Sequence, residues 1–386
     1  MDFGRKTLKF GVLEILTNDL AAGKILSEEQ IRAAVEQLVD ENVPAATKAE
    51  FLSRLAAKGE TVAEISAFAR ALRDKSITPP LTAETRAGEI LDVCGTGGDQ
   101  LNTFNISTTV AILCAAGGIA VAKHGNRAVT SKSGSADVLE ALGIRVDYSP
   151  AEAAQALHEH HFAFFFAPNF HPAFKHIAPA RKLCAARGQR TIFNFLGPLL
   201  NPARPTAQLV GVPRPELCEP LAQVLQTLGI RRGMVVCGQV PSSEFRVPSL
   251  EVRTTIATRN PKPETRNSFL DELSTLGENT IAEFYHERGF TVSSSSPEQF
   301  PLQPATLADL AGGDREANAE IIRRILRGDE RGPKRDAVLL NAAAALFVAG
   351  QVRTLADGWD RAVELIDGGA ATKKLNELSQ RTAIRS

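Results

Sequence analysis

Cysteine is scarce in this sequence, and the few cysteines follow no pattern. The chain has 386 residues, and its five cysteines are Cys94, Cys114, Cys184, Cys218 and Cys237. No two of them form a C-x-x-C pair, so the sequence offers neither a zinc knuckle nor a redox motif of that kind. An odd, scattered set also argues against a disulfide framework. We expect reduced thiols and a cytoplasmic location.

The sequence also lacks net charge and long apolar segments. It has 44 Lys and Arg residues against 44 Asp and Glu residues, so its formal net charge is zero. Such a chain has no general attraction for nucleic acid or anionic membranes. The longest apolar run, Val110 to Ala122, is too short to cross a bilayer, and the N-terminus has no signal-peptide pattern. We therefore expect no nucleic-acid partner and no membrane partner.

The first 80 residues are predicted to form a small all-helical domain. Residues 27–30 (SEEQ) and 61–64 (TVAE) are capping boxes, in which a hydroxyl and an acid or amide three residues later satisfy free backbone N–H groups. Apolar residues follow both boxes at helical spacing. The prolines in residues 77–88, ITPPLTAETRAG, indicate a linker.

Residues 85–386 are predicted to form a large α/β domain. Short apolar runs bounded by glycine, such as EILDV and AQLVGV, alternate with helical patterns such as ADVLEALG. This alternation is typical of a mainly parallel sheet flanked by helices. Residues 239–268 break the pattern because they are polar and basic and contain prolines. We expect them to form a surface insertion with a short strand at LEVRTTIAT.

A glycine-rich loop, residues 95–99 (GTGGD), follows the first predicted strand, and a helix is expected to begin near residues 105–108 (NIST). Glycines let backbone N–H groups approach an anion, and a helix N-terminus aims further N–H groups at it. A tight strand-to-helix turn without a ligand is the alternative. The loop is not a dinucleotide fingerprint, because Gln100 replaces the last glycine of G-x-G-x-x-G, and no P-loop G-K-[ST] follows.

A second polar loop follows the next predicted strand, IAVA. This loop includes two glycines, and its polar and charged residues are Lys123, His124, Asn126, Arg127, Ser131, Ser133 and Ser135. Cations and hydroxyls beside a second helix N-terminus make a second anion site. A solvated basic loop is the alternative, but it does not account for the small residues between the cations. Two such loops at successive strand ends suit a ligand with two phosphate groups.

Charged residues later in the chain complete the predicted site. The adjacent carboxylates of Asp271 and Glu272 are candidates for holding Mg²⁺, which bridges to substrate phosphates, although such pairs are also common on surfaces. His171 and Arg181 precede two proline turns and are candidates for binding an acidic group on an acceptor.

Together these segments resemble the anthranilate phosphoribosyltransferase family of tryptophan biosynthesis. The matching segments follow the family's order across residues 90–350 and include DVCGTGGD, NIST, AKHGNRAVTSKSGSADVLEALG, HPAF, RTIFNFLGPLLNPA, LDELSTLGENTIAE and LAGGDREANAEII. The resemblance implies a nucleoside phosphorylase/phosphoribosyltransferase-like fold, further helices of the small domain from residues 172–190, a site between the domains, and a homodimer. It implies transfer of phosphoribose from PRPP to the amine of anthranilate with release of pyrophosphate, Mg²⁺ as cofactor, and the second step of the tryptophan branch.

The resemblance assigns roles position by position. The implied PRPP contacts are Gly95, Thr96, Gly98, Asp99, Asn105, Ser107, Thr108, Lys123 and Ser135. The implied anthranilate contacts are Gly95, His124, Asn126, His171 and Arg181, with Arg181 facing the carboxylate. The implied Mg²⁺ ligands are Asp271, Glu272 and Ser107. Lys123 and Asp99 would stabilise the transition state, and no catalytic nucleophile is implied.

The sequence departs from the family pattern in three places. Cys237 stands where the family usually has His, and Phe269 follows the insertion where the family approaches its acidic pair through Asp-Gly-Leu. Arg181 and Arg190 are further apart than the family leads us to expect. Either Arg181 still binds the acceptor, or an insertion has moved it and the acceptor differs. A pyrimidine nucleoside phosphorylase and a non-catalytic nucleic-acid-binding relative are alternatives, which the complete GTGGD and KHGNR segments and the zero net charge oppose.

Overall fold

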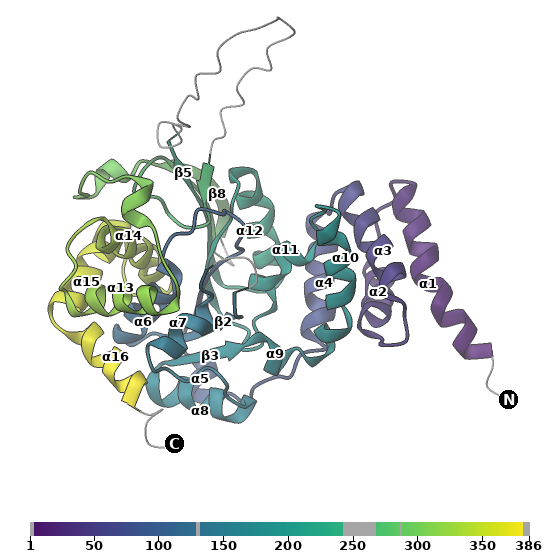
Figure 1. Ribbon diagram of the computed structural model, residues 1–386, viewed down its shortest axis with the longest axis horizontal. Helices are drawn as coiled ribbons and strands as arrows, with labels where there is room; N and C mark the ends of the chain where they lie inside the picture. The colour runs from purple at the N-terminus through teal and green to yellow at the C-terminus, as the bar shows by residue number, and fades with distance from the viewer. Residues whose placement is uncertain (1–3, 129–131, 242–267, 286–287, 381–386) are drawn as a thin grey trace, which may run out of the picture.

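The chain folds into a small helical part and a larger α/β part, which lie side by side (Figure 1). The computed structural model describes residues 4–128, 132–241, 268–285 and 288–380. The first helices are α1 (Gly4–Ala21), α2 (Glu28–Val39), α3 (Ala45–Lys58) and α4 (Val62–Arg73). Both predicted capping boxes are present, with Ser27 and Thr61 as the N-cap residues of α2 and α4.

A single sheet forms the centre of the α/β part. Its strands are β1 (Ile90–Gly95), β2 (Ala120–Gly125), β3 (Phe162–Phe166), β4 (Ala207–Gly211), β5 (Arg232–Val240), β6 (Ser268–Leu270), β7 (Asn279–Tyr285) and β8 (Arg288–Ser295). Their order is β3-β2-β1-β4-β5-β7-β8, and β6 pairs with β5. The pairs from β3 to β5 are parallel, as predicted, because each connection crosses over through helices.

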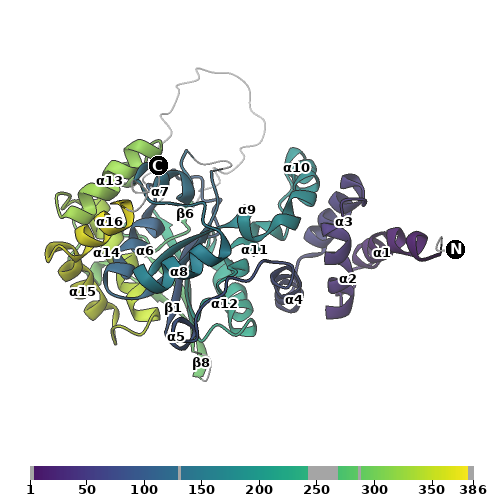
Figure 2. The ribbon, with the colours of Figure 1, turned by 90° about the horizontal axis from the view of Figure 1, so that it is seen from below.

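Helices cover both faces of the sheet (Figure 2). The remaining α-helices are α5 (Ala83–Ala87), α6 (Ile106–Ala116), α7 (Ser135–Ala141), α8 (Pro150–His160), α9 (Ala167–Phe170), α10 (Ala178–Ala186), α11 (Phe193–Leu196), α12 (Cys218–Thr227), α13 (Arg315–Arg327), α14 (Pro333–Val348), α15 (Leu355–Asp367) and α16 (Ala370–Gln380). Of these, α10 lies with the helical part, beside α3 (Figure 1). The 3-10 helices are η1 (Pro172–His176), η2 (Gly197–Leu200), η3 (Pro215–Leu217), η5 (Pro297–Gln299) and η6 (Leu307–Leu310). Helices α6 and α14 pack on one face, and α8 and α12 pack on the other. Among the described residues, no helix is both long and apolar enough to cross a bilayer.

The sheet changes direction between β1 and β4. The chain runs outward from β1 through β2 to β3 and then returns to place β4 on the other side of β1. In open α/β sheets, ligands bind at the carboxyl ends of the strands at such a switch point, because the connections leave it in opposite directions. The glycine-rich loop begins at the carboxyl end of β1, so the topology places the candidate site there.

The two parts share one hydrophobic core. Buried residues of α2, α3 and α4 are continuous with those of α12 and of the sheet face beneath it. Helix α10 packs against α3, and α4 packs against α12. Two buried cations cross the junction: Arg73 Nε donates to Leu199 O at 2.6 Å, and Lys48 Nζ donates to His176 O at 2.9 Å. The segment after β3 therefore fixes the helical part beside the sheet.

The antiparallel edge formed by β7 and β8 was not predicted from the sequence. These strands pair with each other, and β7 also pairs antiparallel with β5. The predicted insertion at residues 239–268 is described only at its ends, where Gln239 pairs with Phe269 and Val240 with Ser268. The short strand expected at LEVRTTIAT lies outside the described residues.

Candidate functional site

Two glycines at the switch point make room for the loop of residues 271–274, which contains Asp271 and Glu272 and is here called the acidic loop. Gly95 and Gly211 are directly paired at the ends of β1 and β4. A Cβ atom on Gly95 would lie 2.3 Å from Asp271 Oδ2, and one on Gly211 would lie 1.5 Å from Asp271 O. Both distances are far inside van der Waals contact, so only glycine permits this approach. Gly95 was predicted as a site residue, whereas Gly211, at the end of AQLVG, was not.

The glycine-rich loop turns sharply above the strand end. Gly97 and Gly98 have φ angles of 73° and 95°, in the left-handed region that favours glycine. The backbone N–H of Gly97 donates to Asp271 Oδ2 at 2.6 Å. Thr96 N donates to Gly211 O at 2.9 Å, and Asp99 Oδ1 accepts from Leu101 N at 3.2 Å. The loop is therefore fixed to β4 at its start and closed by its own aspartate at its end.

The first turn of α6 lies beside the same acidic loop. Ser107 N donates to Glu272 Oε1 at 3.2 Å, so a carboxylate already occupies the positive end of the helix. Thr108 is buried, and within the described chain its hydroxyl has no hydrogen-bond partner. Asn105 Oδ1 accepts from Asn318 Nδ2 at 2.9 Å, which fixes the orientation of the Asn105 amide. In this cluster of polar groups, the Thr108 hydroxyl is the donor that is available to an anionic ligand.

Lys123 brings a buried positive charge to this cluster. Its side chain is only 2% exposed, and Nζ donates to Val93 O at 2.8 Å and to Ser107 Oγ at 3.4 Å. Burial lowers the pKa of Lys123, while the negative charges of Asp92 and Glu272 raise it. A desolvated cation at a fixed position interacts strongly with any negative charge placed next to it.

The carboxyl groups at the site repel one another. Burial raises the pKa of Asp271 well above its usual range, and the charges of Asp99 and Glu272 raise it further. Burial also raises the pKa of Glu272 to about 7, with Lys123 acting in the opposite direction. A cation placed among these carboxylates would favour their ionised forms.

The donor set fits the way in which proteins hold Mg²⁺. Among the described residues, no group of three or more His, Cys, Asp or Glu side chains is arranged to hold a metal. Mg²⁺, however, is commonly held by only one or two protein carboxylates, with waters and substrate phosphates as the other ligands. Asp271 and Glu272 match that arrangement, and the Ser107 hydroxyl lies next to Lys123 at the same place.

Arg127, in the second polar loop, forms ion pairs with Glu140 and Asp137 of helix α7. Its guanidinium donates to both carboxylate oxygens of Glu140, at 2.6 and 2.7 Å, and to Asp137 at 3.4 Å. These hydrogen bonds raise the pKa of Arg127, and hydrogen bonding to Glu140 makes the largest contribution. The other Asp137 oxygen accepts from Ala128 N and Gly134 N, both at 2.9 Å. Arg127 thus stabilises the loop through ion pairs, contrary to the expectation that its charge serves an anion site.

The small polar residues of the same loop lie closer to the site. Ser135 Oγ donates to Asn126 O at 3.4 Å, and the Asn126 side chain is exposed. Ser133 O accepts from Asn105 Nδ2 at 3.3 Å, which joins this loop to the first turn of α6. The Ser133 hydroxyl is buried and has no partner within the described chain. Ser131 lies outside the described residues.

A row of rings runs from the strand end of β2 towards the helical part. The rings of His124 and His171 are 5.3 Å apart, His171 stacks on Phe174 at 4.9 Å, and Phe174 meets Phe193 edge-on at 6.0 Å. Burial lowers the pKa of His124 to about 3 and that of His171 to about 4. Both imidazoles are therefore neutral at pH 7.

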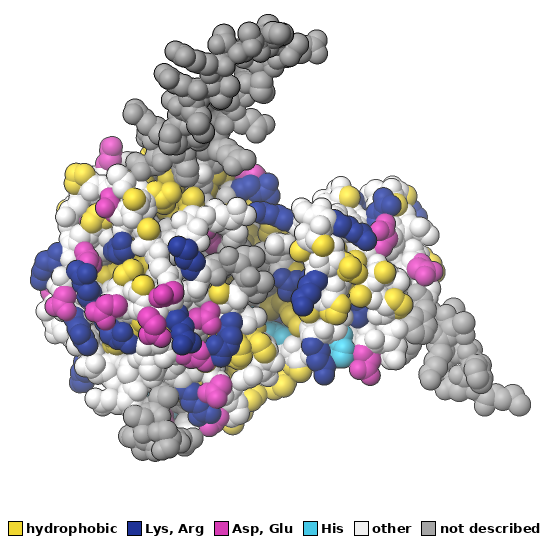
Figure 3. Space-filling view, viewed as in Figure 1, with side chains coloured by type: hydrophobic (Ala, Val, Ile, Leu, Met, Phe, Trp, Pro, Cys, Tyr) yellow, Lys and Arg dark blue, Asp and Glu magenta, His cyan; other side chains and the backbone are white. Residues whose placement is uncertain are grey.

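Arg181 ends this row of rings. Its guanidinium carbon lies 5.3 Å from the centroid of the Phe193 ring, which is a cation–π distance. Much of the side chain is exposed, yet enough protein surrounds the guanidinium that burial lowers its pKa. The surface is hollowed between the helical and α/β parts, with basic and apolar side chains along it (Figure 3). The predicted acceptor residues His124, His171 and Arg181 are thus connected through aromatic rings.

A buried amide network under the strand ends was missed by sequence reasoning. Asp92 in β1 accepts from Asn201 Nδ2 at 2.9 Å, from His124 N at 3.3 Å and from Gln208 Nε2 at 3.4 Å. Asn201 Nδ2 also donates to Ala122 O at 2.7 Å. Burial raises the pKa of Asp92 to about 6. The network fixes the Asn-Pro turn against β1 and β2, and only the proline after Asn201 signalled it in the sequence.

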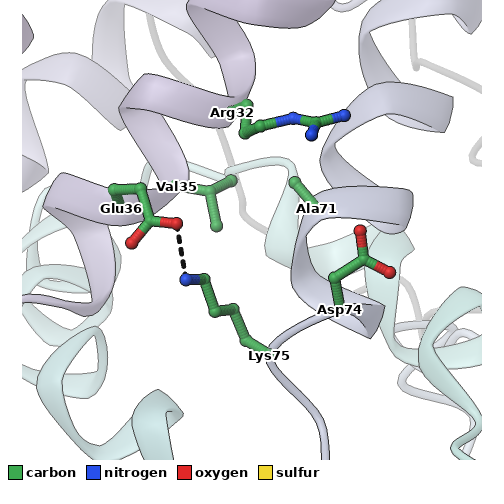
Figure 4. A pocket seen from close by; sticks show the side chains of 6 residues that line it. All are labelled: Arg32, Val35, Glu36, Ala71, Asp74 and Lys75. Carbon is green, nitrogen blue, oxygen red and sulfur yellow. Dashed lines mark ion pairs between the residues drawn. The ribbon is translucent and has the colours of Figure 1, made fainter.

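A separate small pocket lies in the helical part, between α2 and the end of α4 (Figure 4). Its volume is about 140 Å³, and it is lined by Arg32, Val35, Glu36, Ala71, Asp74 and Lys75. Lys75 Nζ and Glu36 Oε1 form an ion pair at 2.5 Å across it. None of the predicted site residues lines this pocket, and we do not assign it to the site at the sheet.

Comparisons with known proteins agree with the fold. Residues 15–76 match a family described as "Glycosyl transferase family, helical bundle domain", and residues 87–249 and 265–372 match "Glycosyl transferase family, a/b domain". An anthranilate phosphoribosyltransferase of Petrotoga mobilis is 43% identical over 364 residues, covering 94% of this chain and 95% of the relative. That of Lacticaseibacillus casei is 43% identical over 353 residues and covers 92% of both chains.

Solved structures give the same picture. The crystal structure of anthranilate phosphoribosyltransferase from Thermus thermophilus has a TM-score of 0.79 and 37% identity, covering 95% of this chain and 99% of that chain. The Saccharomyces cerevisiae enzyme in complex with PRPP and Mg has a TM-score of 0.77 at 24% identity, covering 96% and 98%. At that identity the yeast likeness shows the shared fold alone.

Proposed function

This chain belongs to the anthranilate phosphoribosyltransferase family, and from that premise we propose that it transfers the phosphoribosyl group of PRPP to the amine of anthranilate. The products are N-(5-phosphoribosyl)anthranilate and pyrophosphate, in the second step of the tryptophan branch. The observation that carries the proposal is the glycine-lined switch point, where two loops and an acidic pair converge beside the row of rings. The family membership sets aside the nucleoside phosphorylase and nucleic-acid-binding alternatives.

The reaction requires that the protein position its two substrates, and it does not require a reactive side chain. The bond between C1 of the ribose and the pyrophosphate oxygen breaks, and a bond between C1 and the amine nitrogen forms. Pyrophosphate leaves with the bonding electrons, and the amine releases one proton. Positive charge develops on the ribose and negative charge on the leaving group, so fixed donors and cations next to the leaving group lower the barrier. The aromatic amine is already nucleophilic, so no strong base is required.

The phosphates of PRPP are proposed to bind between the glycine-rich loop and α6. The contacts carried over from the family resemblance are Gly95, Thr96, Gly98, Asp99, Asn105, Ser107, Thr108, Lys123 and Ser135. The buried, unpartnered hydroxyl of Thr108 supports this placement, because a buried donor without a partner is rare unless a ligand uses it. Lys123 would stabilise the leaving pyrophosphate as a fixed, desolvated charge.

Asp271 and Glu272 are proposed to hold Mg²⁺, with the Ser107 hydroxyl as a further ligand. Bound there, the ion would neutralise charge on the pyrophosphate as it leaves. The raised pKa values of the two carboxyl groups support this role, because a nearby cation would favour the ionised forms. Asp99 would add a third negative group close to the ion and orient the glycine-rich loop.

Anthranilate is proposed to lie along the row of rings. His124, Asn126 and His171 would line its path together with Gly95, and Arg181 would face its carboxylate. Neutral imidazoles accept or donate a single hydrogen bond without repelling the developing positive charge at the amine. The flat, largely apolar surface of the rings suits an aromatic acceptor.

Assembly and location are also proposals. We propose a homodimer formed through the helical part, as the family resemblance implies, and Ile15 and Ile25 are 63% and 64% exposed there. We propose a cytoplasmic location, which the five free cysteines support.

Purified protein is expected to consume anthranilate only when PRPP and Mg²⁺ are both present. The loss of anthranilate fluorescence measures this consumption.

Arg181→Ala should raise the KM for anthranilate about 10- to 100-fold and change kcat little, since a hydrogen bond to a charged group contributes roughly 1.5–3 kcal/mol. Lys182→Ala removes an exposed cation from the same helix and is the matched control.

Two outcomes of this assay would contradict the proposal. Absence of turnover by the wild type with PRPP, Mg²⁺ and anthranilate would reject the reaction itself. An unchanged anthranilate KM in Arg181→Ala, with normal turnover, would place the acceptor carboxylate elsewhere and reject the role of Arg181.

A further inference from the structure

The loop that carries the acidic pair is held by an asparagine from a distant helix. Asn341 in α14 is fully buried, and its Oδ1 accepts from Leu273 N at 2.9 Å. Its Nδ2 donates to Leu273 O and to Ala337 O, both at 2.9 Å. One side chain thus satisfies both backbone groups of the residue that follows Glu272.

A second asparagine repeats this pattern on the next residue. Asn279 at the start of β7 is 2% exposed, and its Oδ1 accepts from Ser274 N at 2.7 Å. Its Nδ2 donates to Ser274 O at 3.0 Å. The backbone groups of two consecutive residues after the acidic pair are therefore hydrogen-bonded by side chains from α14 and from β7.

Glycines at the strand ends support the same loop from below. A Cβ atom on Gly238 would lie 2.5 Å from both Ser274 N and Ser274 Cβ. With Gly95 and Gly211, three neighbouring strands thus present bare backbone to residues 271–274. The loop is in direct contact with the sheet, and the two asparagines determine how it lies there.

Asn341 is a polar residue in an otherwise apolar stretch of helix α14. Its neighbours from Ala337 to Leu346 are buried and otherwise apolar, as in the core of a helical layer. Burying an amide in such surroundings is unfavourable unless all its groups are bonded. Each hydrogen-bonding group of Asn341 has a partner, and two of the three partners belong to the acidic loop. An apolar residue would pack there, but it would leave the Leu273 peptide unbonded.

We propose that Asn341 is a positioning residue for the carboxylates of Asp271 and Glu272, acting through the peptide of Leu273. This inference rests on the proposed function, in which those carboxylates hold the divalent ion. Residues that orient metal ligands from outside the coordination shell typically change metal affinity or activity 10- to 100-fold when they are replaced. Leu273 is adjacent to Glu272, so a shift of its peptide moves the nearer carboxylate directly.

The test compares Asn341→Ala with Val338→Ala, which shortens a fully buried side chain on the same helix that has no hydrogen-bonding group for the loop. Binding of Mn²⁺, alone and with PRPP, is measured by electron paramagnetic resonance with the acceptor amine omitted. Asn341→Ala should weaken Mn²⁺ binding about 10-fold, and Val338→Ala should bind it as the wild type does. In turnover assays, Asn341→Ala should need about 10-fold more Mg²⁺ and keep its KM for anthranilate.

Equal Mn²⁺ affinity in Asn341→Ala and the wild type would overturn the proposal, as would equal weakening in Val338→Ala. If Asn341→Ala does not fold, Asn341→Asp, which keeps the size and removes the amide donors, is measured with the same expectation and the same refuting result. The Mn²⁺ measurement does not depend on the acceptor. A wild type that binds Mn²⁺ but does not consume anthranilate would therefore reject the proposed function while this inference stands.

Discussion

Gly211→Ala is expected to lower kcat/KM for PRPP at least about 100-fold in a protein that still folds. The new Cβ would lie 1.5 Å from the carbonyl oxygen of Asp271, and backbone at that distance must move. A displacement of about 1 Å in a positioning group is enough to reduce the rate about 100-fold. The loss should fall on PRPP and Mg²⁺ dependence, because the displaced loop carries the proposed metal ligands. Steady-state kinetics with varied PRPP and Mg²⁺ measure it.

Gly289→Ala is the matched control for this substitution. Gly289 lies in β8 of the same sheet, and an added Cβ there would meet no atom within 4 Å. It should leave the kinetics unchanged, so that any loss in Gly211→Ala reports the approach of Asp271. Wild-type kinetics in a folded Gly211→Ala protein would show that the contact between Gly211 and the acidic loop has no role in the reaction.

Lys123→Met is expected to reduce kcat/KM for PRPP about 1,000-fold and also to lower the stability of the fold. Removing one fixed electrostatic donor from a transition state typically reduces kcat 100- to 1,000-fold, and Lys123 supplies a full desolvated charge. Methionine keeps the unbranched stem, but removing only the cation leaves the buried Asp92 carboxylate without its opposite charge, which destabilises the fold. Kinetics and urea unfolding of the same preparation separate the two effects.

Lys48→Met is the matched control, because it also removes a buried lysine and lowers stability. Lys48 is 1% exposed and donates to Asp40 O and His176 O at the junction of the two parts, far along the chain from the acidic pair. Its replacement should affect stability and leave kcat/KM for PRPP within a few-fold of the wild type. A similar rate loss in both variants would mean that Lys123 acts through the fold and not through the substrate.

Local patterns account for what the sequence predicted correctly. The capping boxes at Ser27 and Thr61, and the parallel sheet expected from alternating strands and helices, depend on neighbouring residues and were found as predicted. The glycines at residues 95–99 signalled a special loop because they are clustered. Each of these features can be recognised within about one turn or one strand, where propensity and hydrophobic period dominate.

The features that were missed depend on pairs far apart in the chain. Gly211 is a lone glycine at a strand end, and its meaning appears only when Asp271 lies against it. Asn341 in a run of alanines gives no local hint that it binds the peptide of Leu273, 68 residues away. Arg127 was expected in the anion site because of its charge, but its guanidinium is paired with the carboxylate of Glu140 in helix α7. Tertiary contacts determine the roles of such side chains, and the spacing of residues in the sequence does not reveal these contacts.

A crystal structure with PRPP and Mn²⁺ bound tests the central claim most directly, because the anomalous scattering of manganese locates the ion independently of the protein model. We expect the manganese peak beside the carboxylates of Asp271 and Glu272, with the pyrophosphate between residues 95–99 and the first turn of α6. A manganese peak and a sugar diphosphate bound elsewhere, with residues 95–99 making no contact to either, would contradict the account.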